Sequence, residues 1–257
     1  YTHLFFPHNY FHNLLIVFIG LIGLFKNTKQ NFNHFKLILI VFSLLFIGIL
    51  MAKTNEDFGY YHLPNSLQFA QQKIQFGLGN LNHGFKHISS IFMLMSLNYF
   101  PFFEYYTFNL TNFLFLTFFA IFILKEIYFR YNINLNISSL FLSLLLVLFL
   151  TKFSRLAEYG SDISGQIIIA IYFFYLFEFF FNKKQNLKNK IDYLKISIIL
   201  IVFAVTLKFI SIIFSLIFLL FFLTYKKREI FINLLRLKYL SVIILALTIF
   251  IFLNFSS

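Results

Sequence analysis

Long apolar runs divided by short basic loops constrain the fold of this chain more than any other feature. The run at residues 209–223 contains only Phe, Ile, Leu and two Ser, and similar runs recur along the chain. A run that is apolar on every side has no face suited to water, and in a bilayer only helices and closed barrels satisfy their backbone groups. Barrel strands alternate apolar and polar residues, which these runs do not. We therefore expect an all-α, polytopic integral membrane bundle.

Composition supports the same class of protein. Apolar residues make up 60% of the chain and charged residues 12%, which is too little charge to cover a water-facing surface. The absence of Cys removes disulfides, thiolate metal sites and Cys nucleophiles. The net charge of +12 does not indicate nucleic-acid binding, because the basic residues lie in loops between apolar runs. That distribution is typical of membrane insertion and of contact with membrane lipids.

The apolar runs predict about eight membrane helices. They lie at residues 11–25, 37–52, 105–124, 138–151, 166–181, 196–207, 209–225 and 240–254. Between 196 and 225 only Lys208 interrupts the run, and we expect a hairpin there, since a single crossing would place the basic loops 182–195 and 226–238 on opposite sides. The chain begins with Tyr1 rather than Met, so we expect residues 1–257 to be one transmembrane domain from a longer protein.

Charge asymmetry assigns sides to the loops. With residues 26–36 on the cytoplasmic side, most of the 21 Lys and Arg residues fall on that side. The outer face then receives the polar interval 53–87, the loop 152–165 and Lys208, and with them most of the acidic residues. We expect any chemistry to take place at this outer face.

The polar interval 53–87 contains its own helical signal. Pro64 can open a helix, and the spacing of the apolar residues after it predicts an amphipathic helix to about Gln75, lying flat on the outer face. The next run, at 88–101, is short and interrupted for a membrane span. We expect it to form a partly embedded helix at the same interface.

Two adjacent acids, Glu56 and Asp57, follow the second apolar run. Such a pair can bind a divalent cation such as Mg²⁺ or Mn²⁺, or one carboxylate can act as a general base while the other orients the acceptor. A solvated pair of surface acids is the alternative interpretation. Lys208 is likewise either a functional cation between two apolar runs or a helix-end lysine that snorkels to the interface.

The residues around these acids resemble the first outer loop of GT-C type membrane glycosyltransferases. The likeness covers about residues 37–225 and is specific only at 57–90, where it is carried by Asp57-Phe-Gly-Tyr60-Tyr61-His62-Leu63-Pro64 and Gly77-Leu-Gly79-Asn80-Leu81-Asn82-His83. Such enzymes transfer a sugar from a polyprenyl-phosphate donor to an acceptor at the outer side of a membrane. Many have a His directly after the Asn-Leu pair, whereas Asn82 intervenes here before His83.

The resemblance implies a GT-C-like fold in a bacterial inner membrane, with the catalytic face outward. It implies that Asp57, or failing that Glu56, is the catalytic acid and that Asp162 is a second catalytic acid. Asp57 and Asp162 are also candidate metal ligands. Candidate substrate contacts are His62, Tyr61 and His83, with Arg155 and Lys208 at the leaving phosphate, which requires positive charge. The implied partners are a lipid-linked sugar donor and a glycan or lipid acceptor. A transporter or lipid-linked glycan flippase, or an O-antigen polymerase or ligase, are the alternatives.

Overall fold

The computed structural model describes residues 6–28, 32–50, 56–73, 77–81, 83–86, 89–132, 136–152, 162–181 and 187–217, with 75, 160, 247, 248 and 250 as single positions. These residues are predominantly helical, and no β-strand occurs among them. The prediction of an all-α chain is confirmed.

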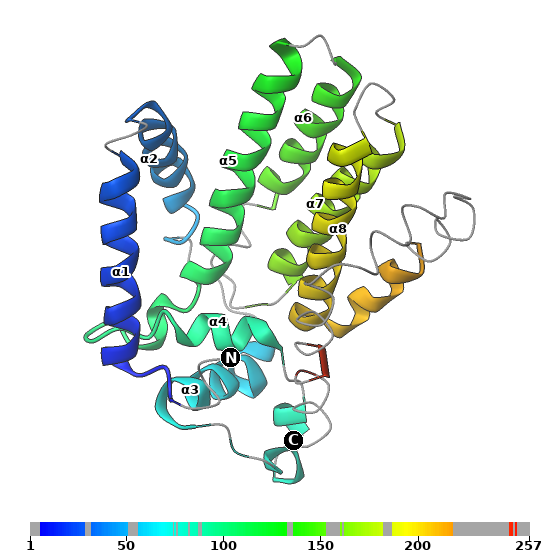
Figure 1. Ribbon diagram of the computed structural model, residues 1–257. Helices are drawn as coiled ribbons and strands as arrows, with labels where there is room; N and C mark the ends of the chain where they lie inside the picture. The colour runs from blue at the N-terminus through cyan, green and yellow to red at the C-terminus, as the bar shows by residue number, and fades with distance from the viewer. Residues whose placement is uncertain are drawn as a thin grey trace.

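Four helices form the main bundle. They are α5 (Leu110–Asn132), α6 (Asn136–Leu150), α7 (Asp162–Phe181) and α8 (Leu187–Leu207), and they lie side by side in Figure 1. Phe113, Leu116, Ile123, Leu142 and Ile167 are fully buried between α5, α6 and α7. On the other side of α5 lie α1 (Tyr10–Thr28) and α2 (Phe32–Phe46), and α2 contacts α5 through a Phe42–Phe113 edge-to-face pair with ring centroids 4.7 Å apart.

Two described helical stretches, Tyr105–Asn132 and Asp162–Phe180, are long and apolar enough to cross a membrane. The helices Tyr10–Lys26, Phe35–Phe46 and Ile137–Leu150 are apolar but shorter. The predicted helix at 209–225 is described only as far as 217, and nearly all of the one at 240–254 lies outside the described residues. The number of membrane spans therefore stays a prediction.

The polar interval contains a helix that begins with an irregular turn. Residues Phe58–His62 form a π-helical turn, closed by the Leu63 amide donating to the Phe58 carbonyl, and α3 (Leu63–Gln71) continues from it. Pro64 lacks an amide donor, which favours such a local widening of the helix. The predicted end at Gln75 is wrong, because the backbone is already extended at Gln72.

The next helix packs against other helices, and its predicted position at the outer interface stays a prediction. In α4 (Ser90–Ser96), Ile91, Phe92 and Met95 are at most 1% exposed. They pack with residues of α3, α7 and α8, namely Phe69, Ala70, Ile168, Ala204 and Leu207. Thus α4 is a core helix that joins the polar interval to one end of the main bundle.

The chain breaks at Lys208, as predicted. Helix α8 ends at Leu207, Lys208 is extended, and helical structure resumes with η7 (Phe209–Ser211) and continues to 217. This segment packs against α7, where the Tyr172 hydroxyl donates to the Phe214 carbonyl at 3.1 Å. The chain therefore turns at Lys208 and returns along the bundle.

A buried ion pair joins α5, α6 and α7 at the opposite end of the bundle. Arg130 Nη1 lies 2.7 Å from Glu178 Oε1 and 3.0 Å from Ser138 Oγ, and its Nη2 lies 3.1 Å from Glu126 Oε2. The Arg130 guanidinium also lies 4.8 Å from the centre of the Phe174 ring. Arg130 and Glu178 therefore form an ion pair inside the bundle, although the sequence suggested that basic residues such as Arg130 would lie in loops.

Candidate functional site

Several chain segments meet at one end of the bundle, which we call the Asp162 end. Asp162 is the first residue of α7, while Lys208 directly follows α8 and Lys152 lies just after α6. The start of α7 is held by α5, because Asn112 donates to the Gly160 carbonyl at 2.8 Å and accepts from the Ser164 hydroxyl at 2.6 Å. This end of the bundle is therefore a fixed platform for side chains from distant parts of the sequence.

The polar interval is attached to this platform through α4. Ser89 caps α4 by accepting from the Ile91 amide at 3.2 Å, and its hydroxyl donates to the carbonyl of Leu207, the last residue of α8. This contact holds Ser89, which follows the polar interval, beside the end of α8 that leads into Lys208.

Lys208 and Asp162 form an ion pair at the Asp162 end. The two side chains are 43% and 46% exposed, so the pair is accessible to solvent or ligand. Asp162 lies in the first turn of α7, so its negative charge stands at the positive end of the helix dipole. Gly165, one turn along α7, lies beside the Lys208 stem, since a Cβ at this position would be in ordinary van der Waals contact with the Lys208 Cβ at 3.7 Å.

Asp57 lies one helical turn before Tyr61, whose hydroxyl donates to Asp57 Oδ2 at 3.2 Å. Glu56 and Asp57 are both exposed. Partial burial, the charge of Asp57, the hydrogen bond to Asp57 and the charge of Asp162 raise the pKa of Tyr61 to about 12. Tyr61 therefore stays a neutral donor that orients the Asp57 carboxylate.

His62 is buried, with 3% of its surface exposed. Its ring lies against Tyr61 and Phe92, with centroids 4.3 Å and 5.4 Å away. Burial lowers the pKa of His62, and the charges of Asp57 and Asp162 oppose that shift only in part. His62 is therefore neutral at neutral pH, and its contact with a substrate stays a prediction.

The negative charges of Asp57 and Asp162 both raise the pKa of Tyr61 and act to raise that of His62. Both acids therefore lie within electrostatic range of the same two side chains, with Asp162 the weaker influence, although they come from different outer segments of the predicted topology. The sequence alone could not establish this.

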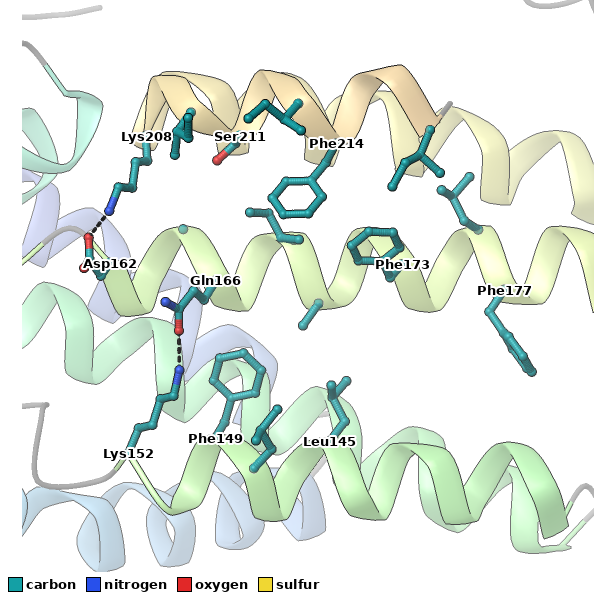
Figure 2. Close-up of a pocket in the computed structure, with 18 of the residues that line it drawn as sticks. Leu145, Phe149, Lys152, Asp162, Gln166, Phe173, Phe177, Lys208, Ser211 and Phe214 are labelled. Carbon is teal, nitrogen blue, oxygen red and sulfur yellow. Dashed lines mark hydrogen bonds and ion pairs between the residues drawn. The ribbon is translucent and has the colours of Figure 1, made fainter. Parts of the chain in front are cut away.

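A cavity of about 830 Å³ opens beside the Asp162–Lys208 pair. It lies between α6, α7 and residues 208–217, as Figure 2 shows. Its polar lining is confined to one end and consists of Lys152, Asp162, Gln166, Lys208 and Ser211. The rest is apolar and includes Leu145, Phe149, Phe173 and Phe177. Lys152 and Gln166, joined by a 2.6 Å hydrogen bond, were not among the residues that the sequence indicated.

The remaining predicted residues are less informative. His83 is exposed in η4 (His83–Lys86), and Arg155 lies outside the described residues. Asp57 is bonded to Tyr61 and Asp162 to Lys208, and the described parts of the chain contain no group of three or more His, Asp or Glu suited to a metal ion. The metal site at Asp57 and Asp162 stays a prediction.

A family model described as "Domain of unknown function (DUF8201)" matches residues 1–256. No curated protein and no solved structure matches the chain.

Proposed function

The chain belongs to the DUF8201 family, and we propose that it is a membrane glycosyltransferase that moves a sugar from a polyprenyl-phosphate donor to a glycan or lipid acceptor. One observation carries the proposal. The Asp162–Lys208 pair stands at the mouth of a largely apolar cavity, and Asp162 acts electrostatically on the same side chains as Asp57. An acid, a cation and an apolar cavity are what transfer from a lipid phosphate requires.

Exposed apolar surface supports a membrane setting. Along α1, Phe11, Phe18 and Phe25 are 85%, 62% and 64% exposed, and residues 14–24 are all exposed and carry no polar side chain. A surface of this kind is rare on a soluble protein and is suited to lipid. The positive-inside pattern supports an outer position for the Asp162 end, and the resemblance to GT-C enzymes implies a bacterial inner membrane.

Asp57 is the proposed general base. The acceptor hydroxyl oxygen attacks the anomeric carbon of the donor while the bond from that carbon to the phosphate oxygen breaks. The acceptor proton passes to the Asp57 carboxylate, which Tyr61 orients, and the leaving phosphate keeps the bonding electrons. Lys208, oriented by Asp162, faces the negative charge that develops on the phosphate, with Glu56 beside the base.

The position of Lys208 favours transfer over transport. Transporters place charged residues near the bilayer midplane in broken helices. Lys208 instead follows the last residue of α8, at the end of the bundle to which the polar interval is attached. An outer-end position beside the acids is suited to a reaction at the membrane surface.

Asp57→Asn tests the proposal, with Glu104→Gln as the control because Glu104 is an exposed acid outside the proposed site. Each protein is purified, reconstituted in proteoliposomes and supplied with a panel of radiolabelled undecaprenyl-phosphate sugars. We expect Asp57→Asn to slow transfer by about 100-fold or more and Glu104→Gln to leave the rate unchanged. Transfer by Asp57→Asn at the wild-type rate would remove the base from the mechanism.

A further inference from the structure

We propose that the cavity between α6, α7 and residues 208–217 binds one long hydrocarbon chain with an anionic headgroup, and that Lys152 is the cation that attracts the headgroup. The inference rests on the proposed function, because the donor is a molecule of this kind, and it assigns a role to a residue that the proposed mechanism does not use.

The polar groups of the cavity lie at one end only. Lys152 and Gln166 stand on one side of the opening and Asp162 and Lys208 on the other (Figure 2). Beyond them the lining side chains are apolar. A polar headgroup inside the apolar part would lose its hydration without compensation, so a bound amphiphile places its headgroup between the two lysines.

Lys152 gives this opening its net positive charge. The charge of Lys208 is balanced by Asp162, whereas the Lys152 ammonium donates to Gln166 Oε1, a neutral amide oxygen. With Lys152 the described charges at the opening sum to one positive charge, and without it they sum to zero. Gln166 fixes the direction of the ammonium but leaves its charge available to an anion.

The shape of the cavity selects a long chain. Its lining extends from Asp162 to Phe180 along α7, which at the rise of an α-helix corresponds to about 27 Å. The opposite wall runs from Phe141 to Lys152, or about 16 Å. The hydrocarbon core of a bilayer is about 30 Å thick. A slot of this length, open at a charged end, is suited to a single extended chain. A free phosphate ion would bind weakly, because it cannot contact the apolar lining.

Binding of simple lipid probes to the purified full chain tests the inference without any sugar. The probes are farnesyl phosphate, farnesol and inorganic phosphate, and native mass spectrometry or a competition titration measures their affinities. We expect farnesyl phosphate to bind about tenfold or more tightly than farnesol, because a charge-assisted hydrogen bond contributes that much. Inorganic phosphate should not displace it.

Variants separate the two parts of the site. Lys152→Ala should lower the affinity for farnesyl phosphate about tenfold without changing that for farnesol, and Lys152→Arg should largely restore it. Ala170→Phe, which fills the buried apolar wall, should weaken both lipids. Lys195→Ala is the control, because Lys195 pairs with Asp192 away from the cavity.

The inference is overturned if farnesyl phosphate does not bind, if inorganic phosphate displaces it, or if Lys152→Ala binds it as the wild type does. Its failure is distinguishable from that of the proposed function. Lipid binding as expected without any sugar transfer would refute only the transferase, whereas sugar transfer at the wild-type rate by Lys152→Ala would refute only the role of Lys152.

Discussion

Arg130 pairs with two carboxylates that differ in burial, and this difference predicts very different costs for losing each. The side chains of Arg130 and Glu178 are 4% and 2% exposed, whereas that of Glu126 is 29% exposed. Glu178→Gln keeps the shape of the side chain but leaves a buried guanidinium without its buried counter-ion, which costs about 3–5 kcal/mol. Glu126→Gln removes a partly exposed pair one helical turn away and costs about 0.3–0.5 kcal/mol.

Equilibrium unfolding in detergent micelles, followed by circular dichroism, measures both losses. The double variant Arg130→Met with Glu178→Met should recover most of the stability lost in Glu178→Gln, because it removes the uncompensated charge and leaves apolar side chains in its place. If Glu126→Gln costs as much as Glu178→Gln, burial does not decide the strength of the pair. If the double variant is no more stable than Glu178→Gln, the loss has another cause.

Three further predictions concern the Asp162 end. Lys208→Met should slow transfer by about 100-fold while changing the unfolding free energy by less than about 1 kcal/mol, because both partners of the ion pair are nearly half exposed; equal losses of rate and of stability would contradict this. The lowered pKa of His62 means that the unfolded chain takes up its proton first as the pH falls below 6.5, so stability is complete above that pH and declines below it. Denaturation midpoints compared above and below that pH should show this decline in the wild type and a smaller one in His62→Gln. Transfer should continue in excess EDTA, because Lys152 and Lys208 supply the positive charge at the phosphate; loss of transfer that Mg²⁺ restores would contradict this and support the metal site at Asp57 and Asp162.

The helices were predictable from the sequence because apolar runs and their interruptions are local signals. The break at Lys208 followed from one charge between two runs, and α5 and α7 followed from run length. The packing of α4 was not predictable, because a short apolar run does not indicate which other helices it will contact. Its burial against α3 and α8 appears only in the folded chain.

The candidate site was predictable only in part. Local motifs indicated Asp57 and Asp162, but spacing alone carries no information on which side chains meet across the bundle. The pairing of Lys152 with Gln166 spans a loop, and that of Arg130 with Glu178 spans 48 residues, so neither leaves a signal in one sequence. The burial of His62 likewise depends on Phe92, which belongs to another helix.

The fate of a labelled sugar in proteoliposomes tests the central claim most directly. The donor is a polyprenyl phosphate that carries a radiolabelled sugar, and the measurement is whether the label becomes covalently attached to an acceptor lipid or glycan. We predict that the label moves to the acceptor, that free polyprenyl phosphate appears in equal amount, and that Asp57→Asn slows both by about 100-fold or more. Label that crosses the bilayer while still attached to polyprenyl phosphate would contradict transfer and identify the protein as a flippase.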